Sequence, residues 1–402
     1  MAKRDVIKAY ALKNAVEHDG KAQIGSVING LFNERLKKEN IKKLIPEIQE
    51  KIDEINKLDF SIQKIEYEKL KKFVGQRKAR EGLPELEKVG KRGVIMRFSP
   101  SPSGPLHIGH ALTASPSFLY YKRYGGKFYV RIEDTNPENI YKPSYEMIEK
   151  ESKWLFGDET KFVIQSYRMN LYYKYIEKLL RKKSIYVCTC SQDKFKLYIS
   201  NKKSCPCRNL LIKDQMMRWK KMLDKKGYKE GEAVIRFKSG MYHKNPAFRD
   251  FPLARINTTK HPLQNNKYKV WPLMNLAVIV DDIDMKMTHI IRAKDHRDNA
   301  EKQKLVFKAL GKKYPVAYFL GRIHIKGMEL SSSKMQIDIK NGKYKGWDDP
   351  NLLTIQSLKN KGYKPIAIHK LAEQIGLNEV DKIIDRKELF LLLNNFNKQK
   401  NL

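Results

Sequence analysis

The sequence predicts an α/β protein with a parallel sheet, preceded by a helical module and interrupted by an insertion. Strand-like and helical segments alternate from residue 94 onward, residues 5–88 have helical periodicity, and residues 185–260 break the alternation. The chain has 402 residues, of which 41% are hydrophobic and 10% aromatic. Such a chain can bury sizeable cores, which excludes intrinsic disorder and suggests two or three domains.

The N-terminal region has the pattern of an amphipathic helical module. Apolar residues recur at spacings of three and four, while Lys and Glu fill the other face. The residues of this stripe are Ile41, Leu44, Ile45, Ile48, Ile52 and Ile55. The stretch 81–93 contains Gly, Pro and alternating charges, which is typical of a linker. We therefore expect an N-terminal helical domain at residues 1–90.

Strands and helices then alternate. Residues 94–98 and 127–134 are rich in β-forming side chains, and helical patterns follow at 143–156 and 169–183. This order predicts a parallel sheet, because parallel strands need a crossover connection that is usually a helix. We expect the first half of the α/β domain at residues 91–184.

The alternation stops between about residues 185 and 260. This interval contains all four cysteines, a Lys-rich helical pattern and a strand-like run, so we predict an insertion at residues 185–262. The α/β pattern resumes with residues 270–296, and we expect the second half of the domain at 263–345. The remaining segment, 346–402, is predicted to be helical.

The charge of the chain suggests a polyanionic partner. Lys and Arg number 81 against 45 Asp and Glu, which gives a formal net charge of +36. A surface of this kind binds nucleic acid through its phosphates, although a Lys-rich genome or a salt-adapted surface also raises basicity. No apolar run approaches the roughly 20 residues of a membrane span. The N-terminus has no signal-peptide core and cysteines are sparse, so we expect a cytoplasmic protein.

The strongest motif is RFSPSPSGPLHIGHA, residues 97–111. Pro105 suits a first helical turn, and His107 and His110 then lie on one face of the helix, on either side of Gly109. Imidazoles can hydrogen-bond phosphate oxygens, the glycine lets adenine lie close to the backbone, and a helix N-terminus favours negative charge. The motif therefore predicts an ATP site.

A second motif, GMELSSSKM at residues 327–335, follows a strand-like run. Its hydroxyl groups and Lys334 can clamp the β- and γ-phosphates of ATP, because the hydroxyls donate hydrogen bonds and the ammonium group offsets charge. Alone, this motif is weak evidence for an ATP site, and the prediction depends on the first motif.

The four cysteines form a third constellation: Cys188 and Cys190 in CTC, then Cys205 and Cys207 in CPC. Four thiolates from two close pairs suit tetrahedral zinc, and a cytoplasmic chain rarely forms disulfides. We predict a structural Zn²⁺ site. Both pairs are CxC rather than CxxC, and the alternative is a set of free thiols in a degenerated site.

The two signature motifs resemble those of class I aminoacyl-tRNA synthetases, and the residues around them resemble archaeal-type glutamyl-tRNA synthetases. The matching segments include VIKAYALKNAVEHDGKA, YGGKFYVRIEDTNP, YVCTC, YKVWPLMN, DDIDMKMTHIIRAKDHRDN and KYKGWDDPNLLTIQSL. The resemblance implies a Rossmann-like catalytic domain, split by a zinc-bearing insertion that contacts the acceptor arm of tRNA. It also implies ATP-dependent activation of glutamate to glutamyl-adenylate with Mg²⁺, followed by transfer to tRNA.

The resemblance also assigns roles to single residues. Arg97 and Arg292 would bind the two carboxylates of glutamate, with Ser101 and Asn275 in the same pocket, and Glu133 would hold the ammonium group. The implied catalytic residues are His107, His110 and Lys334, and the implied ATP-binding residues are Gly109, Ser331 and Ser333.

Three positions depart from the family pattern. Ser332 stands where the second signature usually has a lysine, Met274 stands where the amino-acid pocket commonly has a tyrosine, and Asn136 replaces a usual aspartate. Because Met274 removes a hydroxyl group from the pocket, a glutaminyl-tRNA synthetase or a dual-specificity synthetase is one alternative. Because of Ser332, a catalytically weak paralog that binds tRNA is another.

The C-terminal segment departs from the family as well. The resemblance implies two anticodon-binding β-barrels, and nothing after Phe390 is expected to form them. A truncated or split gene product, a paralog that uses the acceptor arm alone, and an enzyme that attaches glutamate elsewhere are three explanations. In the first case, a separate polypeptide would supply the anticodon contacts.

Overall fold

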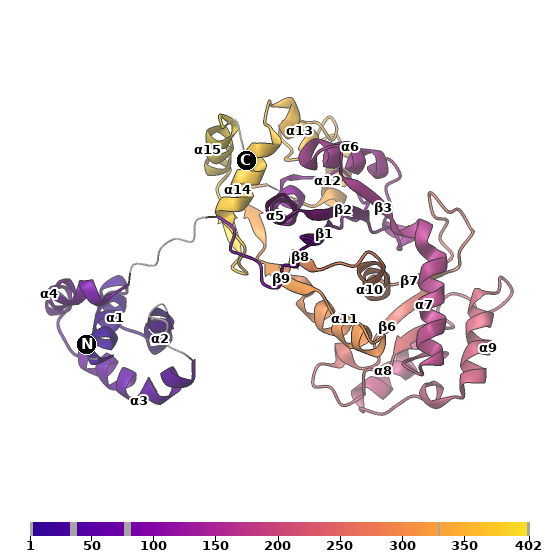
Figure 1. The fold of residues 1–402 in the computed structure, drawn as a ribbon, viewed down its shortest axis with the longest axis horizontal. Coiled ribbons are helices and arrows are strands. Elements are labelled where there is room, and N and C mark those ends of the chain that lie inside the picture. Colours follow the sequence, from indigo (N-terminus) through magenta and orange to yellow (C-terminus); the bar gives the residue numbers. More distant parts are fainter. Residues whose placement is uncertain (1–2, 33–37, 76–81, 329, 400–402) are drawn as a thin grey trace. The chain divides into compact units, whose positions relative to one another are not determined.

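The computed structural model of the chain describes residues 3–32, 38–75, 82–328 and 330–399 (Figure 1). The chain divides into two compact units, Met1–Arg80 and Glu81–Leu402. Among the described residues, none of the helices combines the length and the apolar character that a membrane crossing requires.

The first unit is helical. Its α-helices are α1 (Lys3–Glu17), α2 (Ile24–Phe32), α3 (Lys38–Ile55) and α4 (Phe60–Leu70). Of the predicted stripe, Ile48, Ile52 and Ile55 are buried, Ile45 is 40% exposed, and the side chain of Ile41 lies outside the described part of the chain. The amide of the buried Gln63 donates to the carbonyls of Gly20, Ile55 and Leu58. These bonds hold α4 against the ends of α1 and α3.

The second unit contains the parallel sheet that the sequence predicts. β1 (Val94–Phe98) pairs with β2 (Gly126–Ile132), β2 with β3 (Lys161–Ile164), and β8 (His289–Ala293) with β9 (Val316–Leu320), all in parallel. Thr288 joins the two groups, because its N–H donates to the carbonyl of Ile95 and its hydroxyl accepts from the N–H of Ile95. The resulting order, β3-β2-β1-β8-β9, is that of a doubly wound α/β fold.

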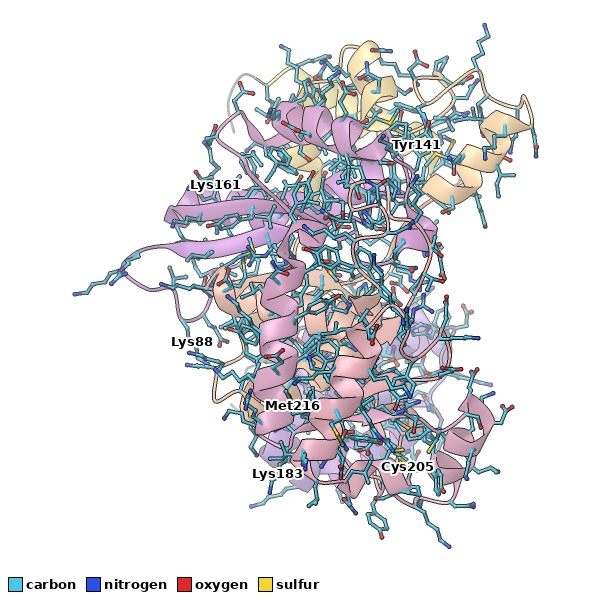
Figure 2. All side chains as sticks on the ribbon, turned by 90° about the vertical axis from the view of Figure 1, so that its right-hand side faces the viewer. Lys88, Tyr141, Lys161, Lys183, Cys205 and Met216 are labelled. Atoms are coloured by element: carbon cyan, nitrogen blue, oxygen red, sulfur yellow. The ribbon has the colours of Figure 1, made fainter. Side chains whose placement is uncertain are left out.

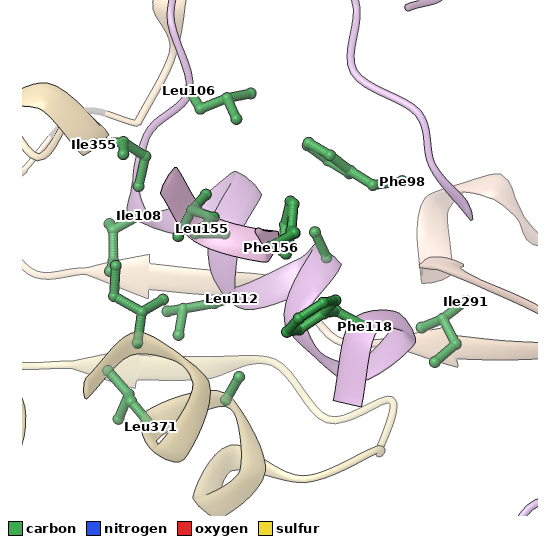
Figure 3. Close-up of a cluster of buried hydrophobic side chains, with 14 of the residues drawn as sticks. Phe98, Leu106, Ile108, Leu112, Phe118, Leu155, Phe156, Ile291, Ile355 and Leu371 are labelled. Carbon is green, nitrogen blue, oxygen red and sulfur yellow. The ribbon is translucent and has the colours of Figure 1, made fainter. Parts of the chain in front are cut away.

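The two faces of β1 pack against different partners. Met96 and Phe98 belong to a core with α5 (Ile108–Tyr124) and α6 (Ser144–Phe156), part of which is drawn in Figure 3. Ile95 packs into a smaller cluster on the opposite side. A strand that is apolar on both faces is expected in a parallel sheet covered on both sides.

The other helices and the short 3₁₀ segments complete the second unit. The remaining α-helices are α7 (Met169–Arg181), α8 (Gln192–Ser200), α9 (Ile212–Leu223), α10 (Met274–Asp284), α11 (Arg297–Ala309), α12 (Ser332–Lys340), α13 (Ile355–Asn360), α14 (Pro365–Ile375) and α15 (Arg386–Asn397). The 3₁₀ segments of the two units are η1 (Lys71–Phe73), η2 (Pro137–Asn139), η3 (Gln165–Arg168), η4 (Pro206–Asn209), η5 (Pro246–Phe248) and η6 (Lys294–His296).

The predicted linker at 81–93 is part of the second unit over its described residues. Leu83 and Leu86 are buried in the core around β1, and the carbonyl of Glu87 lies 2.8 Å from Nε2 of the buried His289. The compact units therefore divide after Arg80, whereas the sequence places the boundary at residue 90.

The insertion is built on an antiparallel sheet, in the order β4 (Ile185–Cys188), β5 (Val234–Phe237), β6 (Pro252–Ile256) and β7 (Val270–Pro272). The sequence pattern assigns residues 270–272 to the resumed α/β pattern. That interpretation is wrong, because β7 pairs antiparallel with β6. Apolar side chains alone do not show which strand a segment will join.

The C-terminal segment is mostly helical, as predicted, with one exception. β11 (Lys382–Ile384) pairs in parallel with β10 (Ile323–Ile325), next to the second signature motif. A strand of three residues is too short for its periodicity to be recognised in a sequence.

Candidate active site

A cavity of about 270 Å³ lies at the C-terminal ends of β1 and β8, where ligands bind in α/β sheets. Four of the residues predicted to bind the amino acid line it: Arg97, Ser101, Glu133 and Arg292. His110, Thr113, Met274 and His296 also line it. We call this cavity the amino-acid pocket.

Arg131 organises the charged groups of this pocket from behind. Its side chain is fully buried, and its guanidinium donates to Asp282 at 2.6 Å and to Glu133 at 3.0 Å. Asp282 also lies 3.6 Å from Nε of Arg97. Burial alone would lower the pKa of Arg131, but the neighbouring carboxylates outweigh burial and raise it. Arg131 is therefore a permanent cation that holds Glu133 and, through Asp282, faces Arg97.

Arg292 is held in a different way. The residue is 8% exposed, and its Nη1 donates to the side-chain oxygen of Gln303 at 2.9 Å. Asn275 does not line the pocket, but its Oδ1 accepts from the same Gln303 amide at 3.1 Å. The predicted residues Arg292 and Asn275 are thus connected through a buried side chain that the sequence analysis did not select.

A second cavity, of about 300 Å³, adjoins the amino-acid pocket and shares Thr113 with it. His107, Gly109, β10, Met328 and Leu330 line it. A Cβ atom at Gly109 would approach the ring of His107 to 3.1 Å, so this backbone is open only because the residue is glycine. We call this cavity the nucleotide cavity.

The two histidines of the first motif form a capping box at the start of α5. Nδ1 of His107 accepts from the N–H of His110, Nδ1 of His110 accepts from the N–H of His107, and the rings stack 3.8 Å apart. Burial lowers the pKa of His110 to about 4 and that of His107 well below its usual range. Both imidazoles are therefore neutral at pH 7. Because Nδ1 is an acceptor in each, the proton lies on Nε2, which can donate to a phosphate oxygen.

The second motif lines this cavity with Met328 and Leu330, but its three serines and its lysine do not line it. Ser331 caps α12, since its hydroxyl accepts from the N–H of Lys334, and the side chains of Ser333 and Lys334 are exposed. None of these three residues lines either cavity. Ser332 is 6% exposed, and its hydroxyl donates to the carbonyl of Pro105 in the first motif. The two motifs are therefore in direct contact.

The comparisons with known proteins agree with this geometry. The family model of class I tRNA synthetases (E and Q), catalytic domain, matches residues 93–400. The glutamate–tRNA ligase of Methanothermobacter marburgensis is 38% identical over 401 residues, which cover 98% of this chain and 71% of the relative. The chain belongs to this synthetase family. The ligase of Pyrococcus abyssi is 40% identical and covers 93% of the chain and 67% of its own length.

Solved structures of the synthetase family support the fold. A glutamate tRNA ligase from Elizabethkingia meningosepticum, in complex with its amino acid, aligns with a TM-score of 0.53 at 20% identity. The alignment covers 75% of this chain and 68% of that one. The predicted resemblance to archaeal glutamyl-tRNA synthetases and the predicted enzyme class, an aminoacyl-tRNA synthetase, are confirmed.

The four cysteines of the synthetase come together in the insertion, as predicted. Their sulfur atoms all lie within 4.8 Å of one another, and Cys188–Cys205 and Cys190–Cys207 are each 3.8 Å apart. Zn–S bonds of about 2.3 Å in a tetrahedron separate sulfur atoms by roughly 3.8 Å. The donor set and its spacing therefore fit zinc. Figure 2 shows Cys205 at the end of the second unit opposite to Tyr141.

Neighbouring polar groups support the cysteine cluster. The N–H and hydroxyl of Thr189 lie 3.5 and 3.6 Å from Sγ of Cys207. Sγ of Cys205 lies 3.7 Å from the hydroxyl of Tyr186, which donates to the buried Asp250. The Thr189 groups can donate to a thiolate at Cys207 and stabilise its charge, whereas the Tyr186 hydroxyl, which donates to Asp250, packs beside Cys205 without donating to it.

Five residues in and around the pocket were not predicted from the sequence: Arg131, Asp282, Gln303, Thr113 and His296. Arg131 had a recognisable signal, because a charged residue in an apolar strand, two positions before Glu133, is rarely buried unless it is paired. Thr113 follows Gly109 by one helical turn and shares its face. Gln303 gives no such signal, since its partners are distant in sequence.

Proposed function

We propose that this synthetase ligates glutamate to tRNA with ATP, through a glutamyl-adenylate intermediate. The observation that carries the proposal is the charge of the amino-acid pocket. Of the side chains that line it, Arg97 and Arg292 carry positive charge and Glu133 carries negative charge, so the lining has one net positive charge. Zwitterionic glutamate has a net charge of −1, whereas glutamine is neutral. Glutamate is therefore the ligand that balances the pocket.

The proposed binding mode follows from the charged side chains that line the pocket. Arg97 and Arg292 would each bind a carboxylate of glutamate, and Glu133 would accept from its ammonium group. Met274 lines the same pocket and offers no hydroxyl, so the arginines carry the discrimination. This arrangement favours glutamate over the glutaminyl and dual-specificity alternatives.

Activation would proceed by attack of the glutamate α-carboxylate on the α-phosphate of ATP, which releases pyrophosphate. The Nε2–H groups of His107 and His110 would donate to phosphate oxygens as negative charge develops. Lys334, Ser331 and Ser333 would bind the β- and γ-phosphates after α12 approaches the nucleotide cavity. Bound Mg²⁺ would offset the charge of the triphosphate. A terminal ribose hydroxyl of tRNA would then attack the adenylate.

The insertion is proposed to bind the acceptor arm of tRNA in the cytoplasm. The helix α9 carries four cations, Lys213, Arg218, Lys220 and Lys221, and the chain has a large positive charge that suits a phosphate backbone. The four cysteines would hold Zn²⁺ in a structural role. Metal analysis should give one zinc per chain. Cys207→Ser should lose it while the exposed Ser204→Ala retains it; equal zinc content in both variants would contradict the assignment.

The decisive experiment is charging of tRNA from the source organism with labelled glutamate and labelled glutamine in parallel, with zinc and magnesium present. We expect label from glutamate alone. Label from both amino acids would establish a dual-specificity enzyme. Retention of tRNA without label, and without pyrophosphate exchange in the presence of tRNA, would indicate a binding paralog.

A further inference from the structure

Gln303 lies at the centre of α11 and has no exposed surface. Its side-chain oxygen accepts from Nη1 of Arg292 at 2.9 Å and from the hydroxyl of Tyr314 at 3.1 Å. Its amide nitrogen donates to Oδ1 of Asn275 at 3.1 Å. One buried amide therefore fixes side chains from β8, from α10 and from the segment that precedes β9.

The arginines of the amino-acid pocket have chemically different partners. Arg131 pairs with Asp282 and Glu133, and Arg97 lies 3.6 Å from Asp282. Arg292 makes no ion pair with any of the acidic groups that the structure describes, and its Nε is buried without a hydrogen-bond partner. The neutral oxygen of Gln303 occupies one N–H of the guanidinium without offsetting its charge. Arg292 is thus the cation whose charge remains available to a ligand.

We propose that Gln303 is a positioning residue that makes Arg292 discriminate glutamate from glutamine. The inference rests on the proposed function, because it concerns the choice of amino acid by the same pocket. A neutral amide is required for two reasons. It orients the guanidinium of Arg292 and leaves the full positive charge for the substrate carboxylate. Its N–H₂ group also donates to Oδ1 of Asn275, which a carboxylate cannot do.

The substitution Gln303→Glu tests the charge directly. A carboxylate of the same size would form an ion pair with Arg292 and compete with the substrate carboxylate. We expect the KM for glutamate to rise about 10- to 100-fold, the range for a lost charge-assisted hydrogen bond, while kcat changes less. The inhibition constant of glutamine, which brings no charge, should change less than about threefold.

Two further variants separate positioning from folding. Gln303→Met keeps the size but removes both hydrogen-bonding functions, so it should loosen Arg292 without neutralising it and weaken glutamate binding less than Gln303→Glu does. Gln49→Glu, on the exposed surface of the first unit, makes the same chemical change away from the pocket and should alter neither the KM for glutamate nor the inhibition constant of glutamine. Thermal unfolding of each variant reports the structural contribution of Gln303.

The measurements are pyrophosphate exchange and aminoacylation with glutamate in the presence of tRNA, and inhibition of both by glutamine. If the KM for glutamate and the inhibition constant of glutamine change by the same factor in Gln303→Glu, so that their ratio is unchanged, the inference is overturned. If Gln303→Glu does not fold, an unchanged ratio in Gln303→Met overturns it instead. Failure of the unmodified protein to use glutamate would refute the proposed function, which is a separate outcome because it requires no variant.

Discussion

The amino-acid pocket and the nucleotide cavity share Thr113, yet their functional side chains are held differently. Arg97, Arg131 and Arg292 are at most 8% exposed, and each faces a side chain from another element. Ser333 and Lys334 are exposed at the start of α12. Discrimination between similar amino acids needs charges fixed in advance, whereas a phosphate clamp can close around its ligand. Four substitutions test this contrast.

The largest effect is expected from Arg131→Met, on the fixed side. Removal of this cation leaves Asp282 and Glu133 without their main partner, which should lower the free energy of unfolding by about 3–5 kcal/mol. Urea unfolding monitored by tryptophan fluorescence measures this change. The exposed pair of Arg322 with Asp295 provides the control, and Arg322→Met should have little effect on stability. Equal effects of the two substitutions would contradict the assigned role of Arg131.

Lys334→Ala should affect the rate rather than stability. Its side chain is exposed, and its proposed role is to bind the phosphates of ATP. We expect kcat to fall about 10- to 100-fold with an unchanged melting temperature. Single-turnover formation of the adenylate measures the rate. A large loss of stability without a change in rate would place Lys334 among the fixed residues instead.

Ser332→Lys inserts the lysine that the family usually has in this motif. Ser332 is buried, and a Cβ atom at Gly104 would lie only 2.8 Å from the Cβ of Ser332, so a lysine has no space. The substitution should destabilise the protein by about 1–3 kcal/mol, as overpacking does, and should not accelerate activation. Ser332→Ala is the small control. Faster adenylate formation in Ser332→Lys would mean that the two motifs separate during catalysis.

Glu151→Gln tests a buried carboxyl group that contacts the first motif. Oε2 of Glu151 accepts from the N–H of Leu106 at 2.6 Å, and burial raises the pKa of this group to about 8. Since this pKa lies above the unfolded value, the folded state retains the proton, and stability falls as pH rises from about 4.5 to about 8.

Gln keeps the acceptor and does not titrate, so the variant should gain about 1 kcal/mol over the unmodified protein between pH 7 and pH 8. Denaturant unfolding at several pH values measures the difference. Parallel pH profiles for the two proteins would show that Glu151 does not titrate in this window.

The sequence predicted those parts of the site that depend on local order. The first motif predicts a strand, a loop and a helix start, and the structure has β1 and α5 there, with Arg97, His107 and His110 within fourteen residues. The cysteine cluster was predicted for the same reason, from two close pairs. β7 was misassigned, since apolar periodicity does not encode the direction of pairing.

The supporting contacts were not predictable in this way. Arg131 and Asp282 are 151 positions apart, and the whole insertion lies between Arg97 and Asp282 in the sequence. Ser332 departs from the family pattern of the second motif, and in the structure its side chain packs against Gly104. Contacts of this kind form between residues that are far apart in the sequence, so the residue pattern of a single segment does not predict them.

The junction of β1 with β8 has a consequence for synthesis of the chain. Ile95 and Thr288 are separated by 193 positions, so the sheet remains incomplete until the insertion has been translated. At common elongation rates this delay is roughly 10–40 s. The antiparallel strands of the insertion pair over shorter distances and can form first. During this interval, the free edge of β1 is the site most exposed to wrong pairing, and a chaperone bound there would protect the nascent chain.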